Sequence, residues 1–289
     1  MRWLAPVLIA VVAATCRVSA QETGREIGYV ESFDKKANVF VLHRGGQTLP
    51  IDALTPVRTG DRIEVLDATA KIVLRLVNRA TPVTVSRGNL DTPLTDPPPA
   101  HPFWTPTIAW AASQIGKLDR DDREQVAASI RGSASGGAVP LLALAQTLPA
   151  GRQSLSIGWI GTAPAEIRLQ GPDGKDVTSG QGTAGYWFSP MLDLAPGDFV
   201  IEVKIGATRV RQLVTVVPAT SMPDISPDLK QDGLPEPLRE LATAAWLAAR
   251  DQRFILAAFQ HVAPFARDSS PAKLLARSLV RGERPLPPG

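Results

Sequence analysis

The sequence has almost no cysteine and little histidine. Its single cysteine, Cys16, falls in an apolar N-terminal stretch that we expect to be removed, which leaves no disulfide, no thiolate metal ligand and no cysteine nucleophile. The three histidines, His43, His101 and His261, are too far apart in sequence to form a helix-borne metal pair. We therefore predict neither a metal site nor a cofactor.

Long apolar runs are missing after residue 20, because Arg, Lys, Asp or Glu interrupts each one, and a membrane-spanning helix needs about 20 apolar residues. Residues 1–20 have the features of a signal peptide: Arg2 supplies the positive charge, residues 4–15 are apolar, and residues 18–20 are suited to cleavage. We predict a periplasmic protein with no transmembrane span after cleavage. A retained anchor and lipid attachment at Cys16 are the alternatives.

A strong net charge is also absent. The chain has 31 Lys and Arg against 28 Asp and Glu, a formal charge of +3. Loss of Arg2 and Arg17 with the signal peptide leaves 29 basic residues against 28 acidic ones. Nucleic-acid-binding proteins carry a basic stripe or patch, so we predict no nucleic-acid partner.

Prolines are abundant and divide the chain. Six of the 26 lie between Pro93 and Pro106, and five lie between Pro218 and Pro237. Proline lacks a backbone N–H and fixes φ, so neither stretch suits a helix interior or a central strand. The predicted organisation is a β domain at 24–90, a proline-rich linker with short helices at 91–137, a second β domain at 138–217, a linker at 218–234 and a helical domain at 235–281.

The first block has the pattern of short strands bounded by turns. Segments rich in β-branched residues occur at 27–30, 39–42, 62–65 and 71–77. In the last of these, apolar side chains alternate with more polar ones, which predicts one buried face and one wetter face.

Three motifs in this block resemble the FecR-type periplasmic domain. They are Gly28-Tyr29-Val30, the Gly60-Asp61 turn that leads into an apolar strand, and the alternating strand at 70–76. The resemblance covers residues 24–90, under a quarter of the chain, and departs from the family at Asn78-Arg79-Ala80-Thr81, where an Asp-Gly-Ser turn is frequent. It implies an extracytoplasmic all-β module of the sensing and binding kind, without the transcriptional role of the classical regulators.

The second block also alternates, with Leu155, Ile157 and Trp159 on one face, and has turns at 172–175 and 206–207. This spacing is typical of an immunoglobulin-like sandwich. In the linker before it, Thr107 is a candidate cap for a helix that extends to Leu118, and a second short helix is a candidate from Asp121 to Ile130.

The third block has helical spacing at 238–249 and 254–262, followed by apolar residues at 274–279. It predicts a helical hairpin and a short third helix. The fold class is therefore mainly β with a C-terminal α region: a FecR-like β domain, an immunoglobulin-like β-sandwich and a small helical domain.

Two literal motif matches lack the context that their chemistry needs. Residues 180–185 read G-x-G-x-x-G, but strand-like residues follow where a nucleotide-binding motif requires a helix, so we interpret them as a mobile loop in a β domain. Residues 270–273 read S-x-x-K without the partner motifs of penicillin-binding enzymes, and Ser270 is interpreted as a helix cap. We predict no catalytic residues and no enzymatic activity.

The aromatic residues give the candidate binding surface: Trp104 beside the proline linker, and Tyr186 and Trp187 beside the glycine-rich stretch. Burial in the core is the commoner fate of such residues. The predicted function is envelope sensing or assembly through binding of an envelope protein partner. The alternatives are a glycan- or peptidoglycan-binding accessory protein and a hydrolase whose site is not visible in the sequence.

Overall fold

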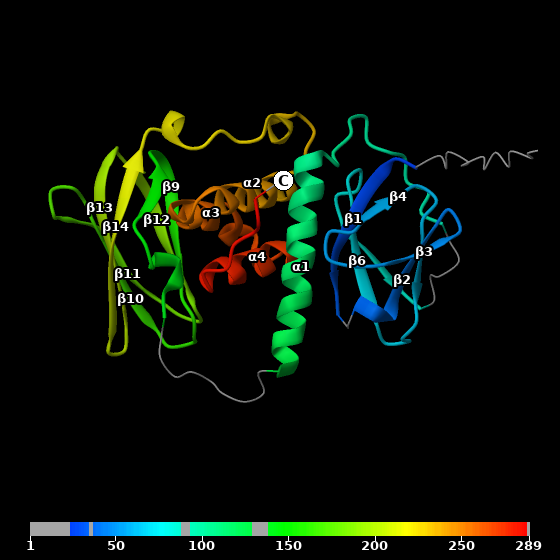
Figure 1. Cartoon of the computed structure of the whole chain (residues 1–289), viewed down its shortest axis with the longest axis horizontal. Coiled ribbons are helices and arrows are strands. Elements are labelled where there is room, and N and C mark those ends of the chain that lie inside the picture. The colour runs from blue at the N-terminus through cyan, green and yellow to red at the C-terminus, as the bar shows by residue number, and fades with distance from the viewer. Residues whose placement is uncertain (1–23, 35–36, 88–92, 129–137, 288–289) are drawn as a thin grey trace, which may run out of the picture.

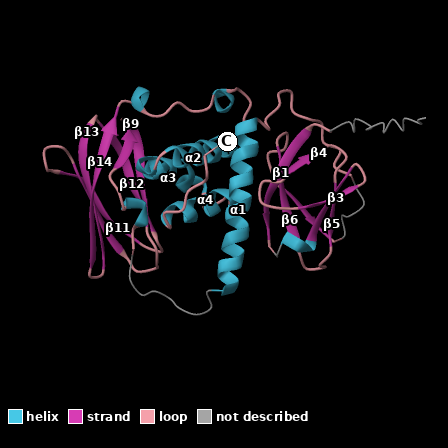
Figure 2. Ribbon diagram, viewed as in Figure 1, coloured by secondary structure: helices cyan, strands magenta, loops and turns pink. Residues whose placement is uncertain are grey.

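The computed structural model describes residues 24–34, 37–87, 93–128 and 138–287. Two β modules lie at opposite ends of the molecule, and helices lie between them (Figure 1). Figure 2 shows the same arrangement by secondary structure, with strands in the outer parts and helices in the middle. The predicted fold class, mainly β with a C-terminal helical region, is confirmed.

The N-terminal β module contains the four predicted strands and three more. One sheet has the order β4-β1-β6-β7 and the other has the order β3-β2-β5. A compact apolar core, which includes Val30, Phe40 and Leu74, lies within this module. Its strands are β1 (Glu26–Phe33), β2 (Phe40–Arg44), β3 (Gln47–Pro50), β4 (Pro56–Arg58), β5 (Arg62–Val65), β6 (Lys71–Leu76) and β7 (Val83–Ser86).

The Gly60-Asp61 turn has a structural purpose in this module. Gly60 has a φ of +88°, which favours glycine. Asp61 is only 1% exposed and accepts hydrogen bonds from the Arg44 guanidinium at 2.7 and 2.9 Å and from the backbone N–H of Arg58 at 2.7 Å. The buried carboxylate is thus paired and hydrogen-bonded, as burial of a charge requires.

The first part of the predicted proline linker is attached to this module. Leu94 exchanges backbone hydrogen bonds with the turn at Gly60 and Asp61, at 2.8 and 2.9 Å. The Arg79 guanidinium contacts Asp96 at 2.6 Å, and Asn78 donates to the carbonyl of Pro97 at 2.9 Å. The connection to the helices therefore begins only near residue 100.

The second part of that linker is a single long helix, α1 (Pro106–Ala128), which packs against helices α2 (Glu236–Arg250) and α4 (Ser270–Val280). The prediction of two short helices, from Thr107 to Leu118 and from Asp121 to Ile130, is wrong. No glycine or proline separates the two segments, so nothing in the sequence stops the helix there. The linker predicted at 91–137 thus contributes to the helical layer.

The second β module is an immunoglobulin-like sandwich. Its five-stranded sheet has the order β11-β10-β13-β14-β8, with β8 parallel to β14, and its other sheet pairs β12 with β9. The predicted hairpin turn is present, with Gly206 at a φ of +56°. The strands are β8 (Gln146–Pro149), β9 (Gly151–Gly158), β10 (Ala165–Gln170), β11 (Asp176–Gly182), β12 (Tyr186–Leu194), β13 (Gly197–Ile205) and β14 (Thr208–Val217).

The predicted helical hairpin and third helix are present as α2, α3 (Ile255–Val262) and α4. The cap of α4 differs from the prediction. Ser269, rather than Ser270, caps this helix, because its extended backbone lets its hydroxyl accept a hydrogen bond from the N–H of Ala272 at 3.4 Å.

Two glutamines join the sandwich to the helices. Gln146 of β8, which is 2% exposed, accepts a hydrogen bond from the N–H of Leu256 in α3 at 3.0 Å. Gln260 of α3 bonds both the N–H and the carbonyl of Ser156 in β9, at 2.6 and 3.0 Å. Buried side chains of α1, the sandwich and the C-terminal helices form one continuous apolar core. The boundary predicted at 218–234 therefore does not divide the core.

Replacing Gln260 by leucine tests this connection. We expect Gln260→Leu to lower the free energy of unfolding by about 1–3 kcal/mol, because the N–H and carbonyl of Ser156 lose their partners on α3. The measurement is urea unfolding followed by circular dichroism. Gln181→Leu, on the exposed side of β11, is the matched control. Equal stabilities of the two variants would contradict the assigned role of Gln260.

Candidate functional site

The structure separates the three aromatic residues of the predicted binding surface. Trp104 is half-buried beside α1, and its ring meets that of Phe103 edge-on at 6.0 Å. Tyr186 is half-buried and stacks on Phe259 of α3, with ring centroids 6.2 Å apart. Trp187 is 6% exposed and lies in the sandwich core, so its prediction as a surface residue is wrong.

The glycine-rich stretch explains why Trp187 is buried. Residues 180–182 belong to strand β11 and residues 183–185 to the turn that follows, so the prediction of a loop over all six residues is wrong. A Cβ at Gly180 would lie 2.5 Å from the indole Nε1 of Trp187, and one at Gly182 would lie 2.5 Å from Trp159. Alternate glycines on a strand thus make room for two indoles, and this spacing was the sequence signal that we missed.

A groove lies between the N-terminal β module and α1, and Trp104 is one of the residues that line it. The groove has a volume of about 360 Å³, within the size range of ligand sites. Its wall on the β module is the loop at residues 52–56. On the helical side it is lined by Trp104, Ala109, Ala112, Ser113, Gly116 and Lys117.

Leu54 fixes the loop that forms the first wall. It has a φ of +64°, a left-handed conformation that costs a non-glycine residue about 1–3 kcal/mol. Its N–H donates to the carbonyl of Val30 at 2.9 Å, and the N–H of Val30 donates to the carbonyl of Thr55 at 2.9 Å. The Leu54 side chain is 2% exposed and belongs to the same core as the buried face of α1. Burial of this side chain in the helical layer offsets the backbone strain.

The helical wall is positioned by a cap from the segment before α2. The Asp228 carboxylate accepts hydrogen bonds from the N–H of Thr107 at 2.9 Å and from its hydroxyl at 2.7 Å. Thr105 accepts from the N–H of Ile108 at 3.3 Å, so Thr105 and Asp228 cap α1 in place of the predicted Thr107. Burial alone would raise the pKa of Asp228, but hydrogen bonds from Ser226, Thr107 and Thr105 outweigh it and lower the pKa to about 2.

The groove has an apolar floor and a polar rim. Small side chains at Ala109, Ala112 and Gly116 make one face of α1 smooth. Ser113 lies beside them and donates its hydroxyl proton to the carbonyl of Trp110 at 2.7 Å. Such a surface suits binding of a ligand by apolar contact, with hydrogen bonds at the rim.

The two histidines within strands and helices lie elsewhere. His43 contacts Glu64 at 2.8 Å on the N-terminal module, and His261 contacts Glu240 at 2.6 Å on the helical layer. The hydrogen bond from His261 lowers the pKa of the Glu240 carboxyl. Across the described ranges, His, Cys, Asp and Glu side chains do not gather in a group of three or more that would hold a metal ion.

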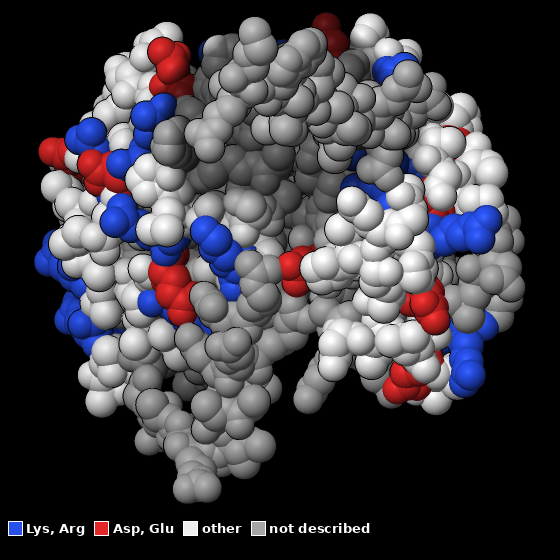
Figure 3. Space-filling model, turned by 45° about the vertical axis from the view of Figure 1, so that its right-hand side comes forward, with Lys and Arg blue, Asp and Glu red and all other residues white. Residues whose placement is uncertain are grey.

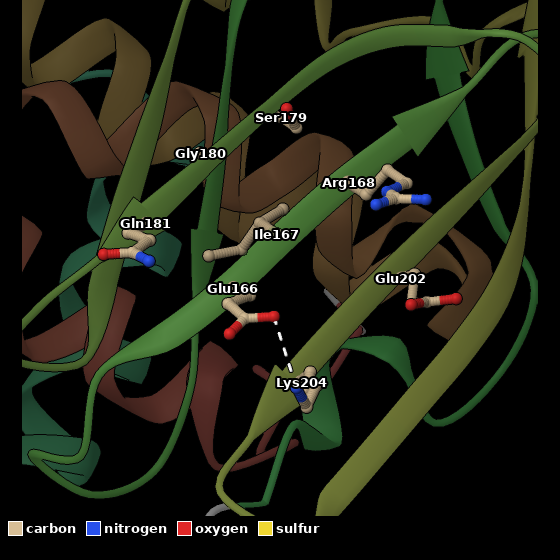
Figure 4. A pocket seen from close by; sticks show the side chains of 8 residues that line it. All are labelled: Glu166, Ile167, Arg168, Ser179, Gly180, Gln181, Glu202 and Lys204. Carbon is tan, nitrogen blue, oxygen red and sulfur yellow. Dashed lines mark hydrogen bonds and ion pairs between the residues drawn. The ribbon is translucent and has the colours of Figure 1, made fainter.

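A second hollow, of about 250 Å³, lies on the outer face of the five-stranded sheet (Figure 4). It is polar: Lys204 contacts Glu166 at 3.4 Å, and Glu202 pairs with Arg209 just outside the hollow at 2.6 Å. The hydrogen bond from Arg209 lowers the pKa of Glu202. Basic and acidic side chains are also interspersed over the face shown in Figure 3. Paired charges of both signs give this sheet face the character of an ordinary solvated surface.

In the part of the chain that the structure describes, no helix combines the length and the apolar character needed to cross a bilayer.

Comparison with protein-family models and with curated proteins gives no match. Among solved structures, domains 4 and 5 of the S-layer protein SbsC are 12% identical, with 64% of this chain and 74% of that chain covered and a TM-score of 0.19. Neural ectodermal development factor IMP-L2 is also 12% identical, with coverages of 66% and 81% and a TM-score of 0.22. The fibronectin(III)-like modules of Clostridium thermocellum CbhA are 12% identical, with coverages of 70% and 91% and a TM-score of 0.21.

The cap on α1 makes a prediction about acid stability. Because the pKa of Asp228 is lowered in the folded protein, its ionised form stabilises the fold above about pH 4, and this contribution is lost as the pH falls toward 2. We expect Asp228→Asn to be less stable than the wild type at pH 6, with the gap narrowing toward pH 2. Urea unfolding between pH 2 and pH 6 measures the difference in the free energy of unfolding between the wild type and the variant. A difference that does not change with pH would contradict the assigned ionisation of Asp228.

Proposed function

We propose that this chain is a non-enzymatic, exported protein that binds a protein partner in the cell envelope, with sensing or assembly as its role. The N-terminal signal-like stretch and the FecR-like motifs support the location and the class of module. The groove between residues 52–56 and α1 supports the mode of action, because it is mostly apolar and lies where the N-terminal β module meets the helical layer.

The observation that carries this proposal is the shape of the groove wall on α1. Ala109 and Gly116 are seven residues apart on one helical face, and the part of the lining that lies on α1 runs from Ala109 to Lys117. A helix rises by 1.5 Å per residue, so this stretch of the wall is about 12 Å long. An extended peptide segment of about four residues would span this length.

Filling the groove tests the proposal. We expect Ser113→Trp to abolish retention of the envelope partner in affinity capture followed by mass spectrometry, because Ser113 is exposed at the rim and an indole there would occupy the groove. Ser179→Trp, at an exposed position on β11, is the matched control and should retain the partner. Equal retention by the two variants would argue against the groove.

Glycan binding is the second candidate, and the position of Trp104 in the groove lining favours it. If a glycan is the ligand, Trp104→Ala should abolish retention on peptidoglycan or polysaccharide, because the stacking surface for the sugar ring is removed. If a protein is the ligand, the wild type should show no such retention. Turnover of any substrate by the purified chain would contradict both candidates.

A further inference from the structure

Strand β11 forms one edge of the five-stranded sheet. It pairs with β10 on one side, and no other described strand pairs with its second side. The opposite edge of the sheet, β8, is covered, because α3 packs against it and Gln146 bonds the N–H of Leu256. Alternate residues of β11 direct their backbone N–H and C=O groups away from β10, toward the side that the fold leaves open.

This open side lacks the features with which proteins usually block strand pairing, namely proline, charged side chains and β-bulges. The one shift of register in the ladder with β10 falls at Val177, near the start of the strand. Residues 178–182, which we call the β11 edge, contain neither proline nor a charged side chain. Strand β12, at the edge of the smaller sheet, contains Pro190 and is blunted in this way.

Side chains alternate between the two faces of the sheet along the β11 edge. A Cβ at Gly180 would lie 2.5 Å from an indole of the sandwich core, so Gly180 faces the core. Ser179 and Gln181 consequently face the outer side, and both are exposed. Across the ladder, Ser179 pairs with Arg168 of β10 and Gln181 pairs with Glu166, as Figure 4 shows on the outer face.

The β11 edge is complementary to a second copy of itself. The two sandwiches lie on the same side of a joined sheet when outward-facing residues oppose outward-facing residues. With an antiparallel pairing about a two-fold axis at Gly180, Ser179 of each copy faces Gln181 of the other. The hydroxyl and the amide then form a hydrogen-bonding pair on both sides of the axis.

Charges on β10 favour this register over its neighbours. With the axis at Gly180, each cross-strand row holds Glu166 of one copy and Arg168 of the other, about 14 Å apart at the backbone. An axis at Ser179 would place two Arg168 residues in one row, and an axis at Gln181 would place two Glu166 residues in one row. Salt partly screens charges at this distance, so they select the register and supply little of the affinity.

The other charges near the β11 edge do not oppose this pairing. Lys175 contacts Asp173 at 3.3 Å, and Asp176 contacts Arg168 at 3.5 Å. In the register centred on Gly180, the start of β11 lies next to the turn at 183–185 of the second copy, which is uncharged. Like charges are therefore not brought together at the ends of the junction.

We propose that two copies of this chain associate through their β11 edges, which joins two five-stranded sheets into one continuous sheet. Backbone hydrogen bonds between the two edges supply the affinity. The contacts between Ser179 and Gln181 and the charge rows on β10 set the register. The junction is short, so the dimer forms reversibly and depends on protein concentration.

This proposal does not rest on the function proposed for the groove. The β11 edge belongs to the second β module, whereas the groove lies between the N-terminal β module and α1. Ser113→Trp, which fills the groove, should leave self-association unchanged. Failure of one proposal is therefore distinguishable from failure of the other.

The test is sedimentation velocity of the full chain at about 1–200 µM, where we expect the wild type to pass from monomer to dimer. Ser179→Lys/Gln181→Lys places lysine opposite lysine on both sides of the axis and should raise the dissociation constant at least about tenfold. Ser179→Lys/Gln181→Glu places lysine opposite glutamate and should restore association. Only the register centred on Gly180 predicts this restoration, because the neighbouring registers oppose lysine to lysine or glutamate to glutamate.

Gln47→Lys/Thr48→Lys is the matched control. It adds the same two charges at exposed positions of β3, which is also an edge strand, and should leave self-association unchanged. Thermal unfolding of each variant confirms that the fold is retained.

Four outcomes would overturn the proposal. They are a wild type that stays monomeric over the whole concentration range, a dimer that the two lysines on β11 do not weaken, a lysine–glutamate variant that does not regain association, and a monomeric wild type whose β11 edge pairs with a strand of a different protein.

Discussion

The architecture depends on how the core of the immunoglobulin-like sandwich is closed. One sheet has five strands and the other has only two, so strands alone cover the core incompletely. Helix α3 closes the side at which β8 and β9 lie, and the amides of Gln146 and Gln260 satisfy backbone groups that would otherwise be buried without partners there. The sandwich and the C-terminal helices are therefore one folding unit.

The same constraint places α1. The C-terminal helices have one side on the sandwich, and α1 covers another, with its start held by Asp228 and its far side turned to the N-terminal β module. Leu54 enters the shared core from that module. The groove at Trp104 is thus a consequence of helix packing, because the small residues on α1 leave space that Leu54 does not fill.

Local sequence patterns predicted the individual strands and helices better than they predicted which of these elements share a core. The strands at 62–65 and 71–76 and the helices after residue 235 follow directly from periodicity. Sequence reasoning joined neither α1 nor the C-terminal helices to the sandwich, because the joining groups are single polar residues, Gln146 and Gln260, with partners more than 100 positions away. The sequence analysis identified Trp104 as a candidate binding residue because it is an aromatic residue beside the proline linker. The loop at Leu54 that completes the groove has a left-handed backbone, and no local sequence pattern predicts this conformation at a leucine.

The dependence of the sandwich on α3 also sets the order in which the protein matures. During synthesis the strands emerge first, and the helices that close the sandwich follow after the segment at 218–234. Until α3 has been synthesised and has packed, the side of the sandwich at β8 and β9 is exposed to solvent. The N–H and carbonyl of Ser156 are then available for pairing with another chain. A nascent chain that stops after β14 would therefore be a substrate for chaperones or proteases rather than a finished domain.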